Sequence, residues 1–378
     1  MKKVYLDYAA TTPADPRVKK AIDPFLNKVF GNTMSLHSFG QEAKMVLEES
    51  RERVAKLINA KAEDVYFTSS ATESNNWVLK GISGRHIIIS SIEHACIEEA
   101  ASWLERKGVK VTRVPVDKFG KVNPLDVEKS ITEDTALVSI IHATNEIGTI
   151  QDIKEIGRIC HEKKVLFHTD ASQSFGKIPI DINEINIDLL TASSHKIYGP
   201  KGAAILYVKK GIGIKPLIHG GGQESGLRSS TVNVPAIAGF AKACEIAQKE
   251  MKKEAKRLSF LRNKLIKEVL KINNAYLTGH PKDRLPNNAS FYFSFVEGES
   301  IVLHLDFSGI AVSTGSACSS AKLSASHVLL ATGLKHEQAH GSVRVSLGRW
   351  TTEDEIEYFV KKLKEVIEKL RAISPFKR

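Results

Sequence analysis

Apolar runs that end in polar or glycine residues recur between residues 60 and 210, and segments of helical periodicity separate them. A short apolar run bounded in this way is typical of a buried strand. Strands are therefore predicted at residues 65–68, 86–90, 109–116, 136–143, 187–192 and 203–208, and another begins at Val165. A helix is predicted over residues 41–59, where apolar side chains repeat at helical spacing, and a second helix begins near Ser70.

Polar side chains follow the ends of several of these strands. Alternating strands and helices favour a mostly parallel sheet with helices on both faces. The carboxyl ends of parallel strands meet at one edge of such a sheet, where open α/β sheets hold their ligands. The residues expected at this edge are His94, Asn145, Asp170, Gln173, His195 and Lys196.

The pattern changes after Val208. Residues 218–231 are rich in glycine and polar side chains, which predicts a flexible segment without regular structure. A long helix is predicted from about residue 235 to residue 270, and it links the large domain to a smaller one that begins near Ala275. In the smaller domain, strands are predicted at residues 289–295 and 343–347, followed by a final amphipathic helix from about Ile356 to Leu370.

Composition narrows the class of protein. The chain has 378 residues, 42% apolar and 26% charged, which is typical of a globular protein with two domains. We expect a cytoplasmic protein that does not bind membranes, because no apolar run approaches the roughly 18 residues that span a bilayer and no apolar signal region follows Met1. The formal charge of +11 is spread over helices of mixed sign, so we expect no nucleic-acid partner. The four cysteines have no paired spacing, which predicts reduced thiols and no metal site.

Lys196 lies just past a predicted strand end and next to His195. Pro200, which follows Gly199, restricts the backbone there because its ring fixes φ. Burial lowers the pKa of a lysine amine, and a neutral amine can form a Schiff base with an aldehyde cofactor. The arrangement points to pyridoxal phosphate, although a lone His-Lys pair is more often solvated.

The start of the helix near Ser70 has two interpretations. Small hydroxyl residues there can cap the helix, with Glu73 as the partner in a capping box. They can also present free backbone N–H groups to a phosphate. The pattern alone favours the cap.

Cys318 stands out among the four cysteines. It lies in residues 313–327, which contain no large apolar anchor apart from Leu323, so we expect a mobile surface segment. Most free cysteines are buried packing residues, whereas a thiol on such a segment is exposed. Cys318 is therefore the candidate for a reactive thiol, and the structural cysteines are expected to be Cys96, Cys160 and Cys244.

Taken together, these segments resemble one family closely, the pyridoxal-phosphate cysteine desulfurases of the NifS/IscS type within the class-V aminotransferases. The segments that carry the likeness are Ser70–Ser74, Glu93–His94, Asn145–Gly148, Asp170–Gln173, His195–Gly202, Gly220–Gly222, Gly315–Cys318 and Arg344–Arg349. The resemblance implies the α/β fold of type I pyridoxal-phosphate enzymes. It implies a large domain (residues 15–260) with a mostly parallel seven-stranded sheet, and a smaller α+β domain (residues 1–14 and 261–378) that carries the cysteine loop.

The resemblance also implies a role for each candidate residue. Lys196 would hold the cofactor and move protons, Asp170 would face the pyridine nitrogen, and His94 would stack on the ring. Of these, the catalytic set is Lys196, His94 and Cys318. The cofactor-binding set is Thr72, His94, Asn145, Asp170, Gln173, Ser193, His195, Lys196 and Thr231, of which Thr231 reaches the phosphate from the second subunit of a homodimer. The substrate-binding set is Asn32, Asn145 and Arg344, and no residue is expected to bind a metal.

In such a family Cys318 would attack the sulfur of L-cysteine, leaving an enzyme persulfide and releasing alanine. The sulfur acceptor would be an iron-sulfur scaffold protein or another carrier, with Cys318 as a possible ligand of a [2Fe-2S] cluster on the scaffold. Three positions depart from the common family pattern. Thr33 follows Asn32 where proline is usual, and Ser70 and Ser230 each replace a glycine.

Other functions are open to the same sequence. A selenocysteine lyase or another type I pyridoxal-phosphate enzyme would share the fold, but a mobile thiol has no use in an aminotransferase. A sulfur-relay protein without cofactor chemistry would not need Lys196, Asp170 and His94. His336–His340 matches the H-E-x-x-H zinc pattern, but the predicted helix is too short, so we interpret His340 as a structural histidine.

Overall fold

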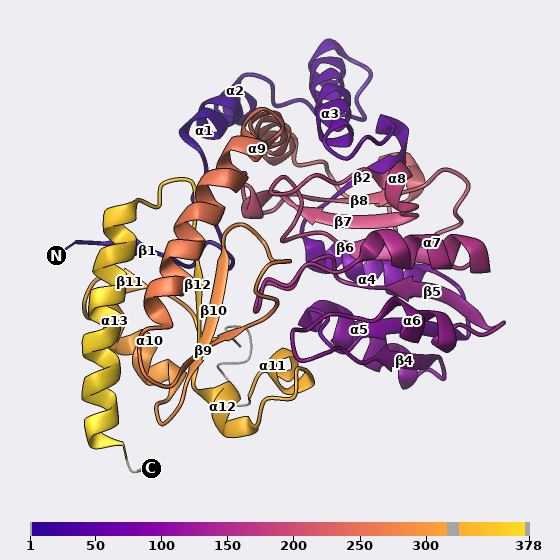
Figure 1. The fold of residues 1–378 in the computed structure, drawn as a ribbon. Helices are drawn as coiled ribbons and strands as arrows, with labels where there is room; N and C mark the ends of the chain where they lie inside the picture. Colours follow the sequence, from indigo (N-terminus) through magenta and orange to yellow (C-terminus); the bar gives the residue numbers. More distant parts are fainter. Residues whose placement is uncertain (1, 316–324, 375–378) are drawn as a thin grey trace.

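The computed structural model describes residues 2–315 and 325–374, and its largest element is a seven-stranded sheet (Figure 1). Its strands, in spatial order, are β2 (Val65–Thr68), β8 (Ala204–Val208), β7 (Leu189–Ser193), β6 (Leu166–Asp170), β5 (Thr135–Ser139), β3 (His86–Ser90) and β4 (Lys110–Val114). Strand β8 is antiparallel to both of its neighbours, and every other neighbouring pair is parallel. The prediction of a mostly parallel sheet is confirmed.

Both faces of this sheet are covered, and successive residues of a strand enter different cores. Ile88 packs into one hydrophobic cluster, whereas Ile87 and Ile89 pack into another. Because side chains alternate across a strand, only an uninterrupted apolar run can fill both sides. This explains why the strands are visible in the sequence as continuous apolar runs.

Helices on the two faces supply the remainder of these cores. One face packs against α4 (Ala71–Gly81) and α5 (Ala95–Glu105). The other packs against α3 (Ser38–Lys56), α6 (Pro124–Ser130), α7 (Ile153–Lys163) and α8 (Ile182–Ile185). The short helices α1 (Pro16–Ile22) and α2 (Pro24–Asn27) lie against the N-terminal part of α9 (Val234–Val269).

The helix predicted over residues 41–59 begins and ends three residues earlier, as α3. The His37 side chain caps its first turn by accepting a hydrogen bond from the Gly40 N–H. At the other end, Asn59 has a left-handed φ of 57°, which no helix residue adopts. Apolar periodicity continued past this end because Ile58 packs into the core from the turn.

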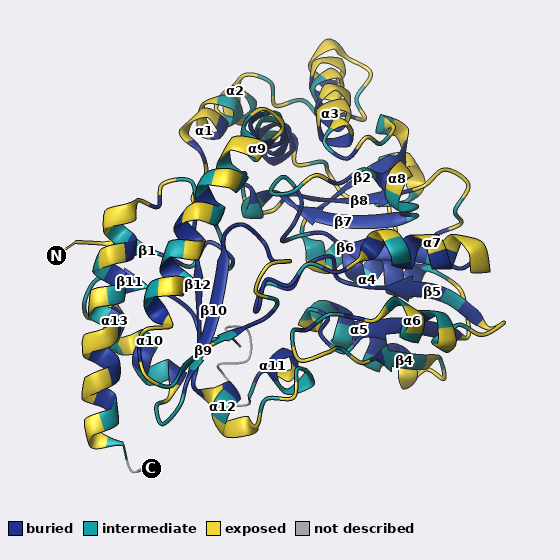
Figure 2. Ribbon diagram, viewed as in Figure 1, coloured by how far each residue is buried: buried dark blue, intermediate teal, exposed yellow. Residues whose placement is uncertain are grey.

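A second hydrophobic core lies around a three-stranded antiparallel sheet. Its strands, in order, are β12 (Ser342–Ser346), β10 (Asn288–Phe293) and β9 (Ala275–Thr278). Near it, β1 (Val4–Tyr5) pairs with β11 (Ile310–Ala311). The helices of this part are α10 (Gly298–Asp306), α11 (His327–Ala331), α12 (His336–His340) and α13 (Glu353–Ile373). The buried interiors of both sheets appear together in Figure 2.

Helix α9 joins the two parts of the molecule. Its residues 236–247 pack into the core of the large sheet, whereas residues 258–269 pack into the second core. Val4 and Leu6, from the opposite end of the chain, also belong to the second core. We propose a large domain of residues 15–260 and a small domain of residues 1–14 and 261–378. The packing of the two ends of α9 into different cores supports this division. In the described residues, no helix combines the length and apolar character that a membrane span needs.

Candidate active site

Lys196 is placed by a tight turn at the carboxyl end of β7. Ser193 is the last residue of that strand, and a short 3-10 helix, Ser194–Lys196, follows it. The turn is closed by the Ile197 and Gly199 N–H groups, which donate to the Ser194 carbonyl at 3.0 and 3.1 Å. A Cβ at Gly199 would lie 2.0 Å from Ser194 Oγ, so any larger residue would force the Ser194 side chain to move.

Lys196 and Gln173 meet at one backbone carbonyl. The Lys196 amine donates to the Ala9 and Ala10 carbonyls at 2.7 Å each, and Gln173 Nε2 donates to the Ala9 carbonyl at 2.9 Å. On the other side, the Lys177 amine donates to Gln173 Oε1 at 3.3 Å. A carbonyl only accepts, so the Ala9 carbonyl fixes the orientation of the Gln173 amide and leaves Oε1 to accept from Lys177. Burial, with a contribution from Lys196, lowers the pKa of Lys177 to about 7.

Asp170 is a buried carboxylate at the carboxyl end of β6. Its Oδ1 accepts from the Ser172 N–H at 2.8 Å and from the Ser172 hydroxyl at 2.5 Å. Its Oδ2 accepts from Asn75 Nδ2 at 2.7 Å. A carboxylate offers about four lone-pair directions, so these three bonds leave capacity for one more donor. The remaining acceptor position of the Asp170 carboxylate fits the N–H of a protonated pyridine nitrogen, and the site therefore suits pyridoxal phosphate.

A chain of polar contacts links Asp170 to His94. Besides its bond to Asp170, Asn75 Nδ2 lies 3.1 Å from Cys96 Sγ, and that thiol lies 3.0 Å from His94 Nδ1. His94 Nδ1 also accepts from the Cys96 N–H at 3.2 Å, so the proton of the neutral ring is on Nε2. Burial lowers the pKa of His94. A neutral imidazole is thereby held beside Asp170.

The other cysteines have the structural character expected of them. Cys160 and Cys244 are buried in the core of the large sheet. Cys96 is partly buried, and burial raises the pKa of its thiol to about 12. A thiol with such a pKa is a poor nucleophile.

The contact between Asn75 and Asp170 was not predicted from the sequence. Asn75 lies on the buried side of a helix whose pattern indicates ordinary packing.

The three predicted phosphate ligands of one chain lie on two neighbouring segments. Ser193 is buried at the end of β7, and Thr72 is exposed in the first turn of α4. His195 Nδ1 lies 3.1 Å from Thr11 Oγ1, and burial, with the charge of Lys196, lowers the pKa of His195 to about 4. His195 is therefore neutral at pH 7.

The cap of α4 differs in part from its prediction. Ser70 is the N-cap, and its hydroxyl accepts from the Glu73 N–H at 3.1 Å, as expected. The Glu73 carboxylate does not complete a capping box on Ser70. It accepts from the Ser69 N–H at 2.9 Å and pairs with Arg228 at 2.7 Å. Glu73 is held away from Ser70 by its ion pair with Arg228, a residue far along the chain, and the local sequence could not predict that pair.

Arg344 and Asn145, predicted to bind the substrate carboxylate, lie side by side. Arg344 is on β12 and is only 1% exposed. Its guanidinium bonds to Asp7 Oδ1 at 2.7 Å and contacts the Asn145 carbonyl at 3.4 Å. In the described part of the chain, Arg344 Nε has no partner. The second core thus contributes a buried cation to the edge of the large sheet.

Two predicted residues lie apart from this group, and one cannot be placed. Asn32 is exposed, and its Oδ1 accepts from the Met34 N–H at 3.0 Å within its own loop. Thr231 is also exposed. Cys318 lies outside the described residues. On the chain that follows it, the hydroxyl of Ser326 donates to the Glu146 carboxylate, directly next to Asn145.

The zinc pattern at His336–His340 is a single short helix, α12. The side chains of His336 and His340 are both exposed, so burial does not support the structural role predicted for His340. His340 is the last residue of α12, and only its neighbours Ala339 and Gly341 are buried there. Over residues 2–315 and 325–374, no three His, Cys, Asp or Glu side chains form a group that could hold a metal ion.

Comparison with known proteins places this site in a family. The model described as aminotransferase class-V matches residues 4–359. Cysteine desulfurase IscS from Dictyoglomus turgidum is 50% identical over 384 aligned residues, which cover 100% of this chain and 98% of that protein. Cysteine desulfurase IscS 1 from Archaeoglobus fulgidus is 51% identical over 380 residues, 99% of each chain. A solved NifS-like protein has a TM-score of 0.92 at 41% identity, covering 97% of this chain and 100% of its own.

These matches cover both cores and every described residue of the predicted site. They confirm the predicted fold, that of the NifS-like type I pyridoxal-phosphate enzymes. Lys196, Asp170 and His94 are the kinds of group that such a cofactor needs. The chain belongs to the class-V aminotransferase family, and its cofactor is pyridoxal phosphate.

Proposed function

We propose that this protein is a cysteine desulfurase, which converts L-cysteine to L-alanine and carries the sulfur as a persulfide on Cys318. The observation that carries the proposal is the identity of about half of all residues, over the whole chain, with proteins named cysteine desulfurase IscS. The proposal is also supported by the position of four residues at the carboxyl-end edge of the large sheet: Lys196, Asp170, Gln173 and His94.

Each residue has a proposed task. Bound pyridoxal phosphate supplies an electron sink for carbanion chemistry on an amino acid. Asp170 keeps the pyridine nitrogen protonated, and Asn75 and Ser172 hold that carboxylate in place. The amine of Lys196 binds the cofactor aldehyde and then moves protons. Neutral His94 covers the ring face.

Phosphate and substrate contacts complete the proposed site. Thr72, Ser193 and His195 bind the phosphate, and the N–H groups at the start of α4 favour its negative charge. Asn145, Arg344 and Asn32 bind the substrate carboxylate. The guanidinium of Arg344 already bonds to Asp7, so it would have to bind the substrate carboxylate and Asp7 together.

The sulfur step is proposed for Cys318. Its thiolate attacks the substrate sulfur, so that an S–S bond forms and the substrate Cβ–S bond breaks. The electron pair of the broken bond stays on Cβ, which takes a proton and becomes the methyl group of alanine. We further propose that the persulfide passes to an iron-sulfur scaffold protein or another acceptor in the cytoplasm.

The test of this function is a pair of measurements on Cys318. After brief exposure to L-cysteine, mass spectrometry should find one added sulfur on the peptide that holds Cys318. Cys318→Ala should still bind pyridoxal phosphate and still change its visible spectrum with L-cysteine, but it should release no alanine. An adduct on Cys96, Cys160 or Cys244 alone, or wild-type alanine release by Cys318→Ala, would contradict the proposal.

We also propose that the protein is a homodimer. Large apolar side chains are exposed along the segment from α2 to α3, a region that is largely solvent-exposed in Figure 2: Leu26, Phe30, Met34, Leu36, Phe39 and Met45. Monomeric proteins rarely leave such a group uncovered. Sedimentation should give a dimer, and a monomer with bound cofactor and full activity would refute this proposal.

A further inference from the structure

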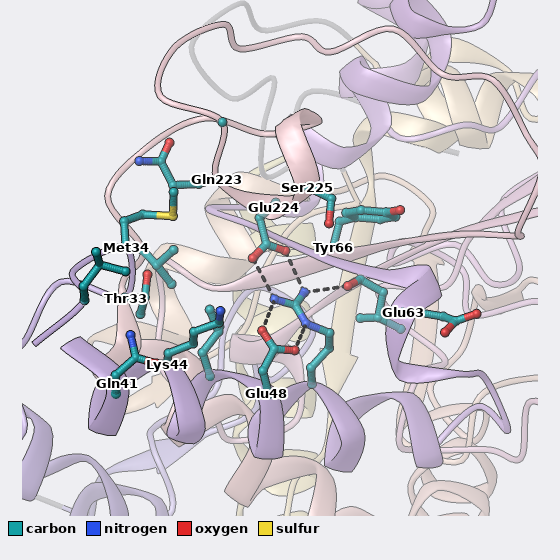
Figure 3. A pocket seen from close by; sticks show the side chains of 16 residues that line it. Thr33, Met34, Gln41, Lys44, Glu48, Glu63, Tyr66, Gln223, Glu224 and Ser225 are labelled. Atoms are coloured by element: carbon teal, nitrogen blue, oxygen red, sulfur yellow. Dashed lines mark hydrogen bonds and ion pairs between the residues drawn. The ribbon is translucent and has the colours of Figure 1, made fainter. Parts of the chain in front are cut away.

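A buried ion pair holds the segment that precedes α9, residues 220–231. The Glu224 carboxylate accepts from the two terminal nitrogens of Arg51 at 2.7 and 2.8 Å, and from the Phe67 N–H at 2.8 Å. The side chain of Arg51 is 9% exposed and that of Glu224 is 3% exposed. In Figure 3 the carboxylates of Glu224 and Glu48 face each other, and dashed lines join both to one guanidinium, that of Arg51. This differs from the free, flexible segment that the sequence predicts.

The same segment is tied down at a second point. Arg228 forms two hydrogen bonds with Glu73 of α4, at 2.7 and 3.0 Å. Between the two ion pairs the segment folds on itself, because the Gly222 N–H donates to Ser229 Oγ at 3.3 Å. The backbone leading to Thr231 is therefore defined by charged contacts with α3 and α4.

Backbone strain marks the first of these two points. Glu224 and Ser225 have φ values of 49° and 58°, in the left-handed region that non-glycine residues rarely adopt. Such a conformation persists only where the surroundings impose it. Packing does not impose it on every side, because a cavity of about 460 Å³ lies beside the turn, lined in part by Met34, Lys44 and Gln223. Backbone hydrogen bonds from the Gly226 and Leu227 N–H groups close the turn, and the Arg51–Glu224 pair anchors it to α3.

We infer that Arg51 and Glu224 are positioning residues that hold residues 220–231 in place before the subunits meet, so that exposed Thr231 is presented to the cofactor phosphate of a second copy of this chain. This inference rests on the proposed homodimer. The cavity beside the turn adjoins the exposed Met34 and Leu36, which belong to the apolar surface of that dimer. Arg51 and Glu224 do not touch the phosphate, and they act through the backbone between residues 224 and 231.

The first test is cofactor binding to the apoenzyme, measured by fluorescence titration with pyridoxal phosphate. Glu224→Gln keeps the shape but loses the ion pair, and we expect its Kd for the cofactor to rise about tenfold, the loss of one charge-assisted hydrogen bond. Arg51→Met should match it. Arg51→Met leaves the Glu224 carboxylate buried without its partner and therefore destabilises the fold. If that variant does not fold, the double variant Arg51→Met/Glu224→Gln, which has no unpaired carboxylate, is measured in its place. Arg113→Met is the control, since Arg113 of β4 pairs with Glu98 and Glu105 of α5 and not with residues 220–231.

The second test shows which subunit is served. Dimers of a Glu224→Gln chain and a Lys196→Ala chain, isolated with two affinity tags, have one site that can link the cofactor. That site lies in the Glu224→Gln chain and receives its segment from the other chain, so its Kd should return to the wild-type value. Wild-type chains paired with Glu224→Gln/Lys196→Ala chains should instead stay about tenfold weaker.

Each failure has its own meaning. Weak binding in the first mixture with normal binding in the second would show that the segment serves its own subunit, which overturns the inference. Wild-type affinity in the homodimeric Glu224→Gln and Arg51→Met variants would also overturn it, and would leave the desulfurase and the dimer untouched. A wild-type protein that sediments as a cofactor-bound monomer would instead refute the dimer itself.

Discussion

Asn75→Asp isolates the contact that supports Asp170. The two side chains have the same shape, so the change opens no cavity and only replaces the donor Nδ2 with an oxygen. Nδ2 lies 2.7 Å from Asp170 Oδ2, and Asn75 is fully buried. Two ionised carboxylates with oxygens at this separation repel each other, by about 6 kcal/mol even at an effective dielectric constant of about 20.

The folded protein can avoid the repulsion by binding one proton between the two carboxylates. Above the ordinary carboxyl pKa of about 3.9, holding that proton costs about 1.4 kcal/mol per pH unit. The expected loss in free energy of unfolding is therefore about 4 kcal/mol at pH 7 and about 1.5 kcal/mol at pH 5. The loss should shrink as the pH falls.

Urea unfolding of the apoprotein at pH 5, 6 and 7 measures this loss. The matched control is Asn76→Asp, the same substitution one residue further along α4, where the amide contacts the Thr72 and Cys96 carbonyls at 3.0 and 3.3 Å. The control should lose about 0.5–1.5 kcal/mol with little dependence on pH. Equal losses in the two variants, or a loss in Asn75→Asp that does not change between pH 5 and pH 7, would refute the reasoning.

Two further outcomes are expected. Lys196→Ala should lose turnover and the visible absorbance of linked cofactor while keeping the wild-type circular dichroism, and undiminished alanine release would contradict its assignment. Glu93 is buried, its Oε2 has no partner among the described residues, and burial raises its pKa from 4.5 to about 8. Between pH 4.5 and pH 8 the folded state therefore retains a proton on Glu93 that the unfolded state has lost. The contribution of Glu93 to stability is complete below pH 4.5 and declines toward pH 8, by at most about 1.4 kcal/mol per pH unit. Glu93→Gln should flatten this decline in urea unfolding, and identical slopes would show that Glu93 is already ionised when folded.

Elements with a strong local pattern were predictable. The strands of the large sheet are buried on both faces, so each one appears as an apolar run, and the polar residues after each run mark its end. The apolar runs alone therefore place Lys196 and Asp170 at one edge of the sheet. The start and end of α3 were displaced because a cap at His37 and a left-handed residue at Asn59 end the helix, and apolar spacing does not report either.

Contacts between segments far apart in the chain could not be predicted in the same way. Asn75 and Asp170 are 95 residues apart, and Arg51 and Glu224 are 173 apart. Nothing local distinguishes Asn75 from an ordinary helix residue or Glu224 from a solvated charge in a glycine-rich loop. Both became identifiable only in the folded structure, where Asn75 donates a hydrogen bond to Asp170 and Glu224 accepts one from Arg51.

The sequence by itself determined the sheet, the order of its strands along the chain and the residues at its edge, because burial and backbone geometry impose short repeating patterns on neighbouring residues. Only the tertiary structure decided how those residues are oriented: which carbonyls hold Lys196, which amide supports Asp170 and which arginine holds residues 220–231. The physical reason is that a buried polar group must find a partner, and the partner is whichever group the fold brings within about 3 Å, at any distance along the chain.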